Sequence, residues 1–503
     1  MYDLEEKVLR IKRGNYTDEN QAIIHLSAEV APFSKKGGLA DVVGVLPNKI
    51  YMKSHMANIV ISPYYKSIRE KIVLIERFYT KFLNVEVYYD VYFVEKNDIQ
   101  YYFIKLEDLY SMDETYMNDN RAYNEEVGLQ YFIFGKCIAD FVDKFELDNI
   151  KLITNDWHVS AIYPYIKDNN KIKKKIHIIH NYHYKGEFYY DILDYVDYEQ
   201  ADEINKQYKK FGYCNMSLFA MMNADKVVTV SNAYAKELID KKAPHTGLDA
   251  IEAYKDKLLG LLNGVDYDIW NPLTDKYIYK NYDKESISNK LYNKKCLYKE
   301  LNIDFDVEKP LIVYINRLTP QKGIDLFVNL KSGKEFNPIS RMKDITGKDV
   351  FFIICGNPPG GEDSIINKCL TNIMNNTNKS FRYINKYTEE IAHKILAAAD
   401  IFIMPSRYEP CGLTQMYALA YGVIPIVNNV GGLKETIKDI SVSEKDGNGV
   451  VMSKLSYDEL IRSIDRAISI YSKKEEWYEL VERCMSRRFL WDRTVDKYIE
   501  LLI

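Results

Sequence analysis

Gly-Gly-Leu occurs once in each half of this chain of 503 residues, both times between an apolar run and a helical pattern. In the first half it is 37–39, after the apolar run 22–28, and in the second it is 431–433, after the run 424–427. Glycines at such a turn allow a tight bend and a close approach of the backbone to a ligand. Because strand-like runs and helical periods alternate through both halves, we expect an α/β protein. It should have two facing Rossmann-like domains with parallel sheets and a cleft between them.

The predicted strands are short runs rich in apolar and β-branched residues. They cover residues 22–28, 57–62, 85–94, 101–105, 151–154, 176–179, 226–230, 311–316, 350–355, 381–384, 401–404 and 424–427. Helical periods lie between them, for example at 40–50 and 129–145.

The length of the chain requires more than one core, because single cores stop growing at about 250–300 residues. The segment 262–266 (LNGVD) reads as a hinge, followed by a polar stretch rich in Tyr, Asn and Lys. We therefore expect a first domain at 1–262 and a second at 263–486. The amphipathic tail 487–503 is expected to pack back on the first domain.

The composition excludes several function classes. A net charge of −4 provides no basic surface for nucleic acid or an anionic membrane. The seven cysteines are scattered, with no CxxC pair, which indicates neither a disulfide framework nor a zinc site and fits a reducing cytosol. Residues 1–20 show no signal-peptide pattern, and no apolar run approaches the ~20 residues of a membrane span. A cytoplasmic protein is expected.

The segment 404–415 (MPSRYEPCGLTQ) carries the clearest signal for chemistry. The apolar run 401–404 delivers Glu409 and a helix opened by Gly412 to one place beyond the end of a strand. Ligands of α/β sheets bind there, and the free N–H groups of a helix start suit a phosphate. A carboxylate beside a phosphate site suggests sugar-nucleotide chemistry. The alternative is a structural corner with a solvated Glu.

Two cations follow the strand predicted at 311–316. Arg317 comes directly after that strand and Lys322 five residues later, where a helix is expected to start. Together they could neutralise a departing diphosphate without a metal ion. The one Asp-x-Asp triplet near a strand, Asp304 to Asp306, reads as a solvated loop, so no metal ligands are assigned. The alternative for Arg317 and Lys322 is a pair of surface cations.

Polar side chains also follow two strands of the first half. Asp156 and Trp157 follow the run 151–154, and His180 follows the run 176–179. A carboxylate beside an aromatic ring suits a sugar, although Trp157 could equally be a core residue. His180 could be a sugar contact or a packed, capping residue.

These segments, in this order, resemble bacterial glycogen synthases and plant starch synthases. The resemblance runs from about residue 22 to the end of the chain. The matching segments are Lys35 with Gly37 to Val42, Asp156 to His158, His180 with Asn181, Leu262 to Asp266, Arg317 with Gln321 to Gly323, and Pro405 to Gln415.

The resemblance implies the two-domain GT-B fold and a reaction without metal ion or cofactor. The enzymes it points to transfer glucose from a nucleotide sugar, usually ADP-glucose, to the 4-hydroxyl at the non-reducing end of an α-1,4-glucan, with retention of configuration. Residues 1–262 would form the acceptor-side domain and 263–486 the nucleotide-sugar donor domain.

The resemblance also implies site residues. Catalytic roles would belong to Glu409, Arg317, Lys322 and His180. Contacts to the donor would come from Lys35, Gly37, Gly38, Asp41, Asn263, Tyr387, Cys411, Gly412, Leu413 and Thr414. Asp156 and Trp157 would line the acceptor and sugar pocket.

Several positions depart from the family pattern. They are Lys36 for the usual Thr, Asn155 for His, Lys386 for Gly before Tyr387, and Leu218 and Ala220 where Lys and Gly are usual. By contrast, Tyr417 replaces the second Glu of broader GT-B relatives in the way typical of the glycogen and starch group.

The leading hypothesis is therefore an α-1,4-glucan synthase using ADP-glucose. Two alternatives stay open. One is the same reaction from UDP-glucose, which Lys386 beside the expected nucleobase contact raises. The other is a catalytically weak homologue that binds glucan and regulates its synthesis, which the departures raise as a group.

Overall fold

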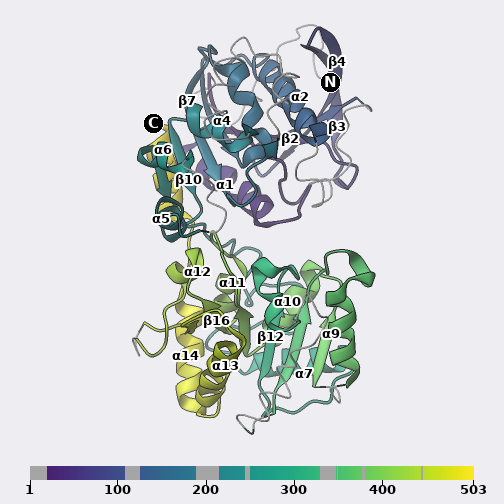
Figure 1. The fold of residues 1–503 in the computed structure, drawn as a ribbon, viewed down its shortest axis with the longest axis vertical. Coiled ribbons are helices and arrows are strands. Elements are labelled where there is room, and N and C mark those ends of the chain that lie inside the picture. The colour runs from purple at the N-terminus through teal and green to yellow at the C-terminus, as the bar shows by residue number, and fades with distance from the viewer. Residues whose placement is uncertain are drawn as a thin grey trace. The chain divides into compact units, whose positions relative to one another are not determined.

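The structure is a computed structural model that describes residues 20–107, 125–188, 214–243, 250–328, 347, 349–376, 380–442 and 446–503. The chain divides into two compact units (Figure 1). Unit 1 runs to Asn263 and includes Trp491–Ile503, and unit 2 is Gly264–Leu490. The expectation for residues 1–20 lies, apart from Asn20, outside the described residues.

Unit 1 is built on a nine-stranded sheet in the order β11-β10-β7-β6-β1-β2-β5-β4-β3. Neighbouring strands from β11 to β5 pair in parallel, with β1 and β6 side by side near the middle. The strands are β1 Gln21–Leu26, β2 Ala57–Pro63, β3 Val73–Phe82, β4 Val85–Lys96, β5 Ile99–Leu106, β6 Asn149–Asn155, β7 Ile172–Ile179, β10 Lys226–Thr229 and β11 Leu258–Gly260. A separate antiparallel pair joins β8 Glu187–Phe188 to β9 Cys214–Asn215.

One edge of this sheet differs from the all-parallel expectation. β3, β4 and β5 are antiparallel neighbours joined by two-residue turns at Leu83-Asn84 and Asn97-Asp98. All four turn residues have positive φ, between 49° and 65°. This is the backbone of the tight hairpin turn that matches the twist of antiparallel strands. Asn and Asp are favoured in such turns, so Asn84, Asn97 and Asp98 were the sequence signal for this antiparallel edge.

The helices of unit 1 connect these strands and cover the sheet. They are α1 Gly38–Ser54, α2 Glu125–Val142, the 3-10 helix η3 Trp157–Ile166, α4 Met216–Asn223, α5 Asn232–Ile239, α6 Ala250–Ala253 and the 3-10 turn η5 Lys255–Lys257. α1 begins at Gly38 of the first Gly-Gly-Leu, so one loop joins the carboxyl end of β1 to the amino end of α1.

The C-terminal helix α15, Asp492–Leu502, belongs to unit 1. It packs on α1 and β7, and Lys53 of α1 forms an ion pair with Asp496 at 2.5 Å. The Thr494 hydroxyl donates a hydrogen bond to the Leu262 carbonyl at 2.6 Å.

Unit 2 contains a six-stranded, fully parallel sheet in the order β14-β13-β12-β15-β16-β17. Its strands are β12 Leu311–Ile315, β13 Phe351–Cys355, β14 Phe381–Ile384, β15 Ile401–Met404, β16 Ile424–Asn428 and β17 Val450–Met452. Counted within the unit, this is the order 3-2-1-4-5-6 of dinucleotide-binding domains. From β12 to β14 each new strand is added on one side of the sheet, and from β15 to β17 on the other side. The strand order therefore reverses between the spatial neighbours β12 and β15.

The helices of unit 2 are α7 Asn289–Glu300, α9 Ile365–Asn376, α10 Glu389–Ala398, α11 Thr414–Ala420, α12 Gly431–Thr436, α13 Tyr457–Tyr471 and α14 Lys474–Ser486. Short 3-10 turns are η6 Pro320–Lys322, η7 Ile324–Leu326 and η8 Gly361–Asp363. The side chains of Thr388 and Ser456 accept hydrogen bonds from the first turns of α10 and α13, which explains where these helices start.

Two helix starts differ from the sequence-based expectation. Lys322 lies in the 3-10 turn η6, not at the start of an α-helix. The helix expected near Lys434 begins earlier, at Gly431.

All seven cysteines are free thiols. Within the described residues, no helix is long and apolar enough to cross a bilayer.

Candidate active site

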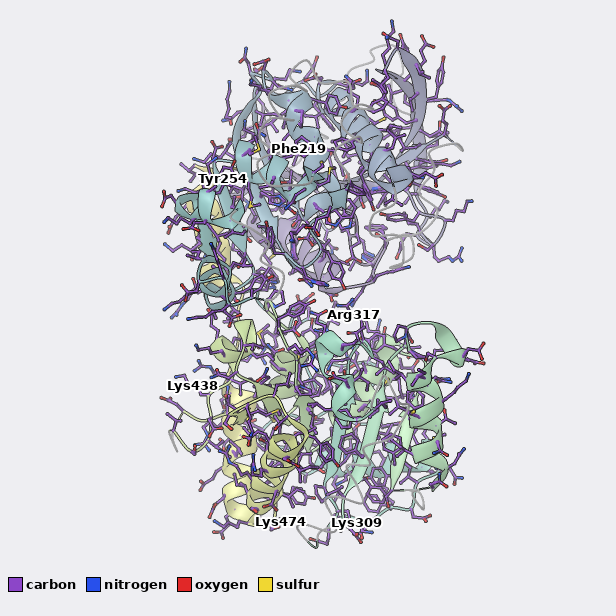
Figure 2. The ribbon with its side chains drawn as sticks, in the orientation of Figure 1. Phe219, Tyr254, Lys309, Arg317, Lys438 and Lys474 are labelled. Atoms are coloured by element: carbon purple, nitrogen blue, oxygen red, sulfur yellow. The ribbon has the colours of Figure 1, made fainter. Side chains whose placement is uncertain are left out.

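The cationic and acidic candidates of unit 2 meet where its sheet reverses direction. Arg317 follows β12 and Glu409 follows β15, and these two strands are neighbours. Figure 2 shows Arg317 at the end of unit 2 opposite to Lys309 and Lys474, which precede β12 and begin α14. This is the carboxyl edge of the sheet, where ligands of such folds bind.

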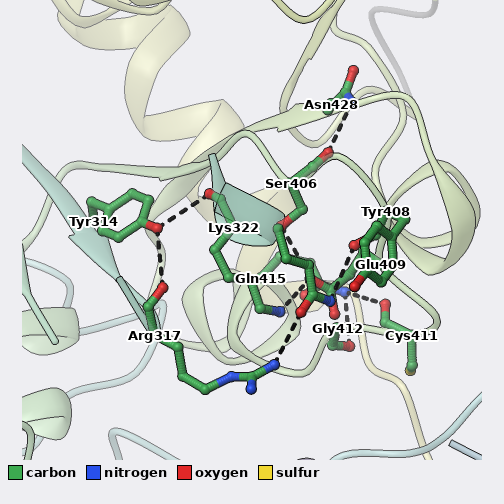
Figure 3. Close-up of polar contacts among 11 residues, drawn as sticks. Tyr314, Arg317, Lys322, Ser406, Tyr408, Glu409, Cys411, Gly412, Gln415 and Asn428 are labelled. Atoms are coloured by element: carbon green, nitrogen blue, oxygen red, sulfur yellow. Dashed lines mark hydrogen bonds and ion pairs between the residues drawn. The ribbon is translucent and has the colours of Figure 1, made fainter. Parts of the chain in front are cut away.

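Lys322 and Glu409 form a buried ion pair (Figure 3). Lys322 Nζ lies 2.5 Å from Glu409 Oε2, which also accepts a hydrogen bond from the Ser406 hydroxyl at 3.0 Å. Glu409 is 5% exposed. Burial lowers the pKa of Lys322 and the nearby Arg317 lowers it further, whereas the Glu409 carboxylate opposes both. A desolvated ammonium of this kind interacts strongly with any anion that reaches it.

Arg317 is held beside this pair by its own loop. Its guanidinium Nη2 donates to Gln321 Oε1 at 3.1 Å. The Tyr314 hydroxyl, from β12, lies 3.4 Å from the Arg317 carbonyl and 3.2 Å from the Lys322 carbonyl (Figure 3). One tyrosine therefore ties both ends of the turn that carries the two cations.

The loop with the cations packs directly on the loop with the carboxylate. The Arg407 N–H donates to the Gln321 carbonyl at 2.8 Å. Gly323 has φ of 80°, and a Cβ there would lie 2.4 Å from the Pro405 carbonyl oxygen. Only glycine combines this backbone conformation with this close approach, so the spacing of Lys322 and Glu409 depends on it.

The second Gly-Gly-Leu supports the Glu409 loop from the other side. The Gly432 N–H donates to the Glu409 carbonyl at 2.9 Å. A Cβ on Gly432 would lie 2.1 Å from the Cys411 carbonyl oxygen, so any side chain there would displace the loop. Gln415 completes the support, because its Nε2 donates to the carbonyls of Cys411 at 3.2 Å and Gly412 at 3.0 Å.

The other donor-side candidates lie on the same edge of the sheet. Gly412 has φ of 71°, and Leu413 and Thr414 form the start of α11, which has seven residues. Tyr387 lies between β14 and α10 with its ring 38% exposed, and its N–H donates to Asn357 Oδ1 at 2.9 Å. An exposed ring fixed through its backbone offers a face for a nucleobase.

Tyr417 is packed into unit 2 by an aromatic stack that sequence reasoning missed. Its ring is stacked on Trp270 with centroids 4.0 Å apart, and Trp270 is stacked on His393 at 3.8 Å. His393 in turn lies 2.7 Å from the Asp275 carboxylate. Tyr417, which stands where broader relatives carry a second Glu, is thus one member of an aromatic stack.

In unit 1, the loop between β1 and α1 brings four candidates together. Lys35 Nζ and Asp41 Oδ1 form an ion pair at 2.7 Å, and Gly37 and Gly38 lie between them in the chain, at the start of α1. Glu29 holds this loop, because its Oε2 accepts hydrogen bonds from the N–H groups of Lys36 at 2.5 Å and Gly37 at 3.2 Å.

Glu29 was missed by the sequence analysis, although a signal was present. It is the only charged residue between the strand β1 and Lys35, and it is fully buried. An isolated acidic residue in a short apolar connection that precedes a glycine turn indicates a carboxylate that binds the backbone of that turn.

Asp156 and His180 meet where the neighbouring strands β6 and β7 end. Asp156 Oδ1 accepts hydrogen bonds from the N–H groups of His180 at 2.7 Å and Asn181 at 3.4 Å. Burial raises the pKa of the Asp156 carboxyl to about 7; the two N–H groups oppose this rise, and the Glu29 carboxylate adds to it. Burial also lowers the pKa of His180 to about 3, so its imidazole is neutral at physiological pH.

Trp157 and Asn263 differ in what surrounds them. Trp157 is half-buried among aromatic rings, stacked on His158 at 4.0 Å and edge-on to Tyr131 at 5.0 Å, so much of it is core. Asn263 is 4% exposed, and its Oδ1 has no hydrogen-bond partner within the described part of the chain. A buried amide oxygen of this kind is available to a ligand hydroxyl.

Asp304 and Asp306 lie in the loop between α7 and β12, with Asp304 exposed. Among the described residues, no group of three or more His, Cys, Asp or Glu side chains could hold a metal ion. On unit 1, the candidates Lys35, Gly37, Gly38 and Asp41 follow β1, and Asp156 and His180 follow its neighbours β6 and β7. On unit 2, the candidates Arg317, Lys322, Glu409, Cys411, Gly412, Leu413 and Thr414 follow the neighbouring strands β12 and β15.

Gly432→Ala should lower turnover more than tenfold, because the new Cβ must push the Glu409 loop away and small misplacements of catalytic groups are costly. Lys434→Ala, an exposed change on the same helix, should keep wild-type turnover and serves as the control. Steady-state kinetics on both proteins checks this. Wild-type turnover in Gly432→Ala would show that the loop does not depend on this contact.

Asp156→Asn should stabilise the protein more at pH 8 than at pH 5. The raised pKa of Asp156 means that the folded state favours the neutral carboxyl, so its contribution to stability is present below pH ~4 and is lost as pH rises through ~7. The difference in melting temperature between variant and wild type should therefore widen from pH 5 to pH 8. The same change at an exposed position of unit 1, Asp148→Asn, is measured beside it as the control for the substitution itself.

Comparison with known proteins finds two family matches along the chain. Residues 22–253 match the family described as the starch synthase catalytic domain, and residues 301–482 match glycosyl transferases group 1. The chain is 32% identical to a glycogen synthase of Fervidobacterium nodosum over 95% of its own length and 98% of that protein. It is also 32% identical to a glycogen synthase of Mycoplasma mobile, over 95% of this chain and 99% of that protein.

Solved structures agree as well. The catalytic domain of starch synthase IV from Arabidopsis thaliana is similar with a TM-score of 0.83 and 25% identity, over 96% of this chain and 98% of that one. A sucrose-phosphate synthase from Thermosynechococcus elongatus shares the fold, with a TM-score of 0.59 and 15% identity, over 96% and 98% of the two chains. These matches confirm the GT-B fold class and the resemblance found in the sequence. The chain belongs to the glycogen synthase and starch synthase family of glycosyltransferases.

Proposed function

We propose that this protein elongates α-1,4-glucans by transferring glucose from ADP-glucose to the 4-hydroxyl at the non-reducing end, with retention of configuration. The observation that carries the proposal is the cluster of Arg317, Lys322 and Glu409 at the point where the sheet of unit 2 reverses direction. Two cations and one carboxylate are the charges that a nucleotide-sugar donor requires.

The cations suit the leaving group. As the bond between the anomeric carbon and the diphosphate breaks, negative charge grows on the phosphate oxygens, and fixed positive charge there lowers the barrier. Lys322 lies 2.5 Å from Glu409, so a phosphate oxygen would share an ammonium that is already held in place. Arg317 can add two parallel hydrogen bonds to the same group.

The carboxylate suits the sugar. In the proposed step the acceptor oxygen bonds to the anomeric carbon on the face that the diphosphate leaves, and the acceptor proton passes to a departing phosphate oxygen. Positive charge develops on the anomeric carbon, and the Glu409 carboxylate would stabilise it. Glu409 is held for this role by Ser406 and Lys322.

Residues of unit 1 would contact the same donor. We assign Lys35 and the Gly37-Gly38 turn to the donor phosphate and glucose, and Asp41, Asn263 and His180 to the sugar. The half-buried Asp156 and Trp157 would line the sugar and acceptor side. Asn263 Oδ1, which has no partner among the residues that the structure describes, and the neutral imidazole of His180 support hydroxyl binding, since both can accept hydrogen bonds from a sugar.

The adenine nucleotide is supported by one relative. The starch synthase IV structure was determined with ADP and acarbose bound, a nucleoside diphosphate and an oligosaccharide-like ligand. In the present chain Tyr387 would lie against the base. Lys386 precedes it, so UDP-glucose is the competing donor.

A cytoplasmic location is supported by the seven free thiols, which suit a reducing compartment.

The donor is tested directly by incubating the purified protein with glycogen and either ADP-glucose or UDP-glucose, and measuring the released nucleoside diphosphate. ADP release with glucan growth at a higher kcat/KM than for UDP-glucose is expected. Preference for UDP-glucose would change the donor but keep the reaction. Glycogen binding without turnover of either donor would favour the regulatory alternative.

Arg317→Ala, Lys322→Ala and Glu409→Gln should each lower kcat by a factor of about 100 to 1,000, because each removes charge stabilisation of the transition state. Circular dichroism should show folded proteins. Lys309→Ala removes a cation at the opposite edge of the same sheet (Figure 2) and should keep wild-type kcat. Labelled-glucose incorporation at the wild-type rate by the Arg317, Lys322 or Glu409 variant would end the assignment of that residue.

A further inference from the structure

Asn155, the last residue of β6, contacts the proposed catalytic residue His180. Its side chain is 1% exposed and both ends are occupied. Nδ2 donates to the Leu26 carbonyl at the end of β1, 3.0 Å away, and Oδ1 lies 2.9 Å from His180 Nε2. Asn155 ends β6 and thus links Leu26, the last residue of β1, to His180, the first residue after β7.

These contacts determine which nitrogen of His180 carries hydrogen. The Leu26 carbonyl can only accept, so the amide must turn its NH₂ group to Leu26 and its oxygen to His180. An amide oxygen can only accept, so Nε2 of His180 must be the donor. In a neutral imidazole the other nitrogen, Nδ1, is then an acceptor. Among the described residues, Nδ1 of His180 has no hydrogen-bond partner.

We propose that Asn155 is a positioning residue that holds His180 in the Nε2–H tautomer, so that Nδ1 accepts a hydrogen bond from a hydroxyl of the transferred sugar. The inference rests on the proposed function, which places His180 against the sugar. It gives a role to a position where this chain departs from the usual His of the family. Burial supports it, because it lowers the pKa of His180 to about 3 and excludes the doubly protonated ring, which has no acceptor.

The same sheet contains a matched control. His25 Nε2 lies 2.8 Å from Asn58 Oδ1, and Asn58 Nδ2 donates to the Met56 carbonyl at 2.9 Å. Both residues are 1% exposed. Asn58 lies at the start of β2, at the amino edge of the sheet, away from the ends of β6 and β7. Removing either asparagine breaks an equivalent buried contact, but only Asn155 reaches His180.

The first test is spectroscopic and begins with the wild-type protein. In protein labelled with ¹⁵N-histidine, the signals of His180 are identified by their absence in His180→Ala. The ¹⁵N shifts should show hydrogen on Nε2 and a bare Nδ1. Hydrogen on Nδ1 in the wild type would overturn the proposal. In Asn155→Leu the fixed tautomer should be replaced by a mixture, and an unchanged tautomer would also overturn it.

The second test is kinetic, with the nucleotide sugar that the wild type accepts. Asn155→Leu should lower kcat/KM by about tenfold to a hundredfold through misplacement of His180, whereas Asn58→Leu should keep wild-type kcat/KM despite a similar fall in melting temperature. In a His180→Ala background, Asn155→Leu should change kcat/KM by less than twofold. An equal loss in both backgrounds would show that Asn155 acts independently of His180. Full activity of His180→Ala would instead refute the proposed sugar contact, while the tautomer measurement would still stand.

Discussion

The contact between Lys322 and Glu409 is the interaction around which the candidate site of unit 2 is arranged. It joins a loop after β12 to a loop after β15, so it exists only because the parallel sheet reverses its order between those strands. Burying both charges is costly unless each is well paired. The surrounding contacts from Ser406, Tyr314 and Gln321 are therefore best understood as the support that keeps two desolvated groups in register. In the proposed reaction, the diphosphate of the donor would supply the remaining negative charge.

Most of the fold could be predicted from the sequence because its strands are buried on both faces. The stretches 311–315 and 401–404 are continuously apolar or aromatic, and the structure places β12 and β15 there. The antiparallel edge could not be read from apolar runs alone, since most side chains of β3 are exposed and those of β4 alternate between buried and more exposed positions. The positive φ of Asn84 and Asn97 decides that topology, and turn chemistry carries this information.

The candidate site was predictable where the signal was local. Arg317, Lys322 and Glu409 each follow a strand, and the structure brings them to one edge of one sheet. The supporting residues could not be found in this way, because their partners are distant in the chain. Glu29 holds a loop through backbone N–H groups, Trp270 stacks on a residue almost 150 positions later, and Asn155 spans strands β1, β6 and β7. Their roles depend on tertiary contacts, and the roles of the catalytic candidates stay predictions.

The placement of α15 has a consequence for how the protein is made. Trp491–Ile503 completes unit 1, but it follows all of unit 2 in the sequence. During translation, unit 1 emerges first, yet the surfaces of α1 and β7 that receive this helix stay uncovered until unit 2 has been synthesised. Unit 1, although it is the first to leave the ribosome, can therefore be completed only after the whole of unit 2 has been synthesised.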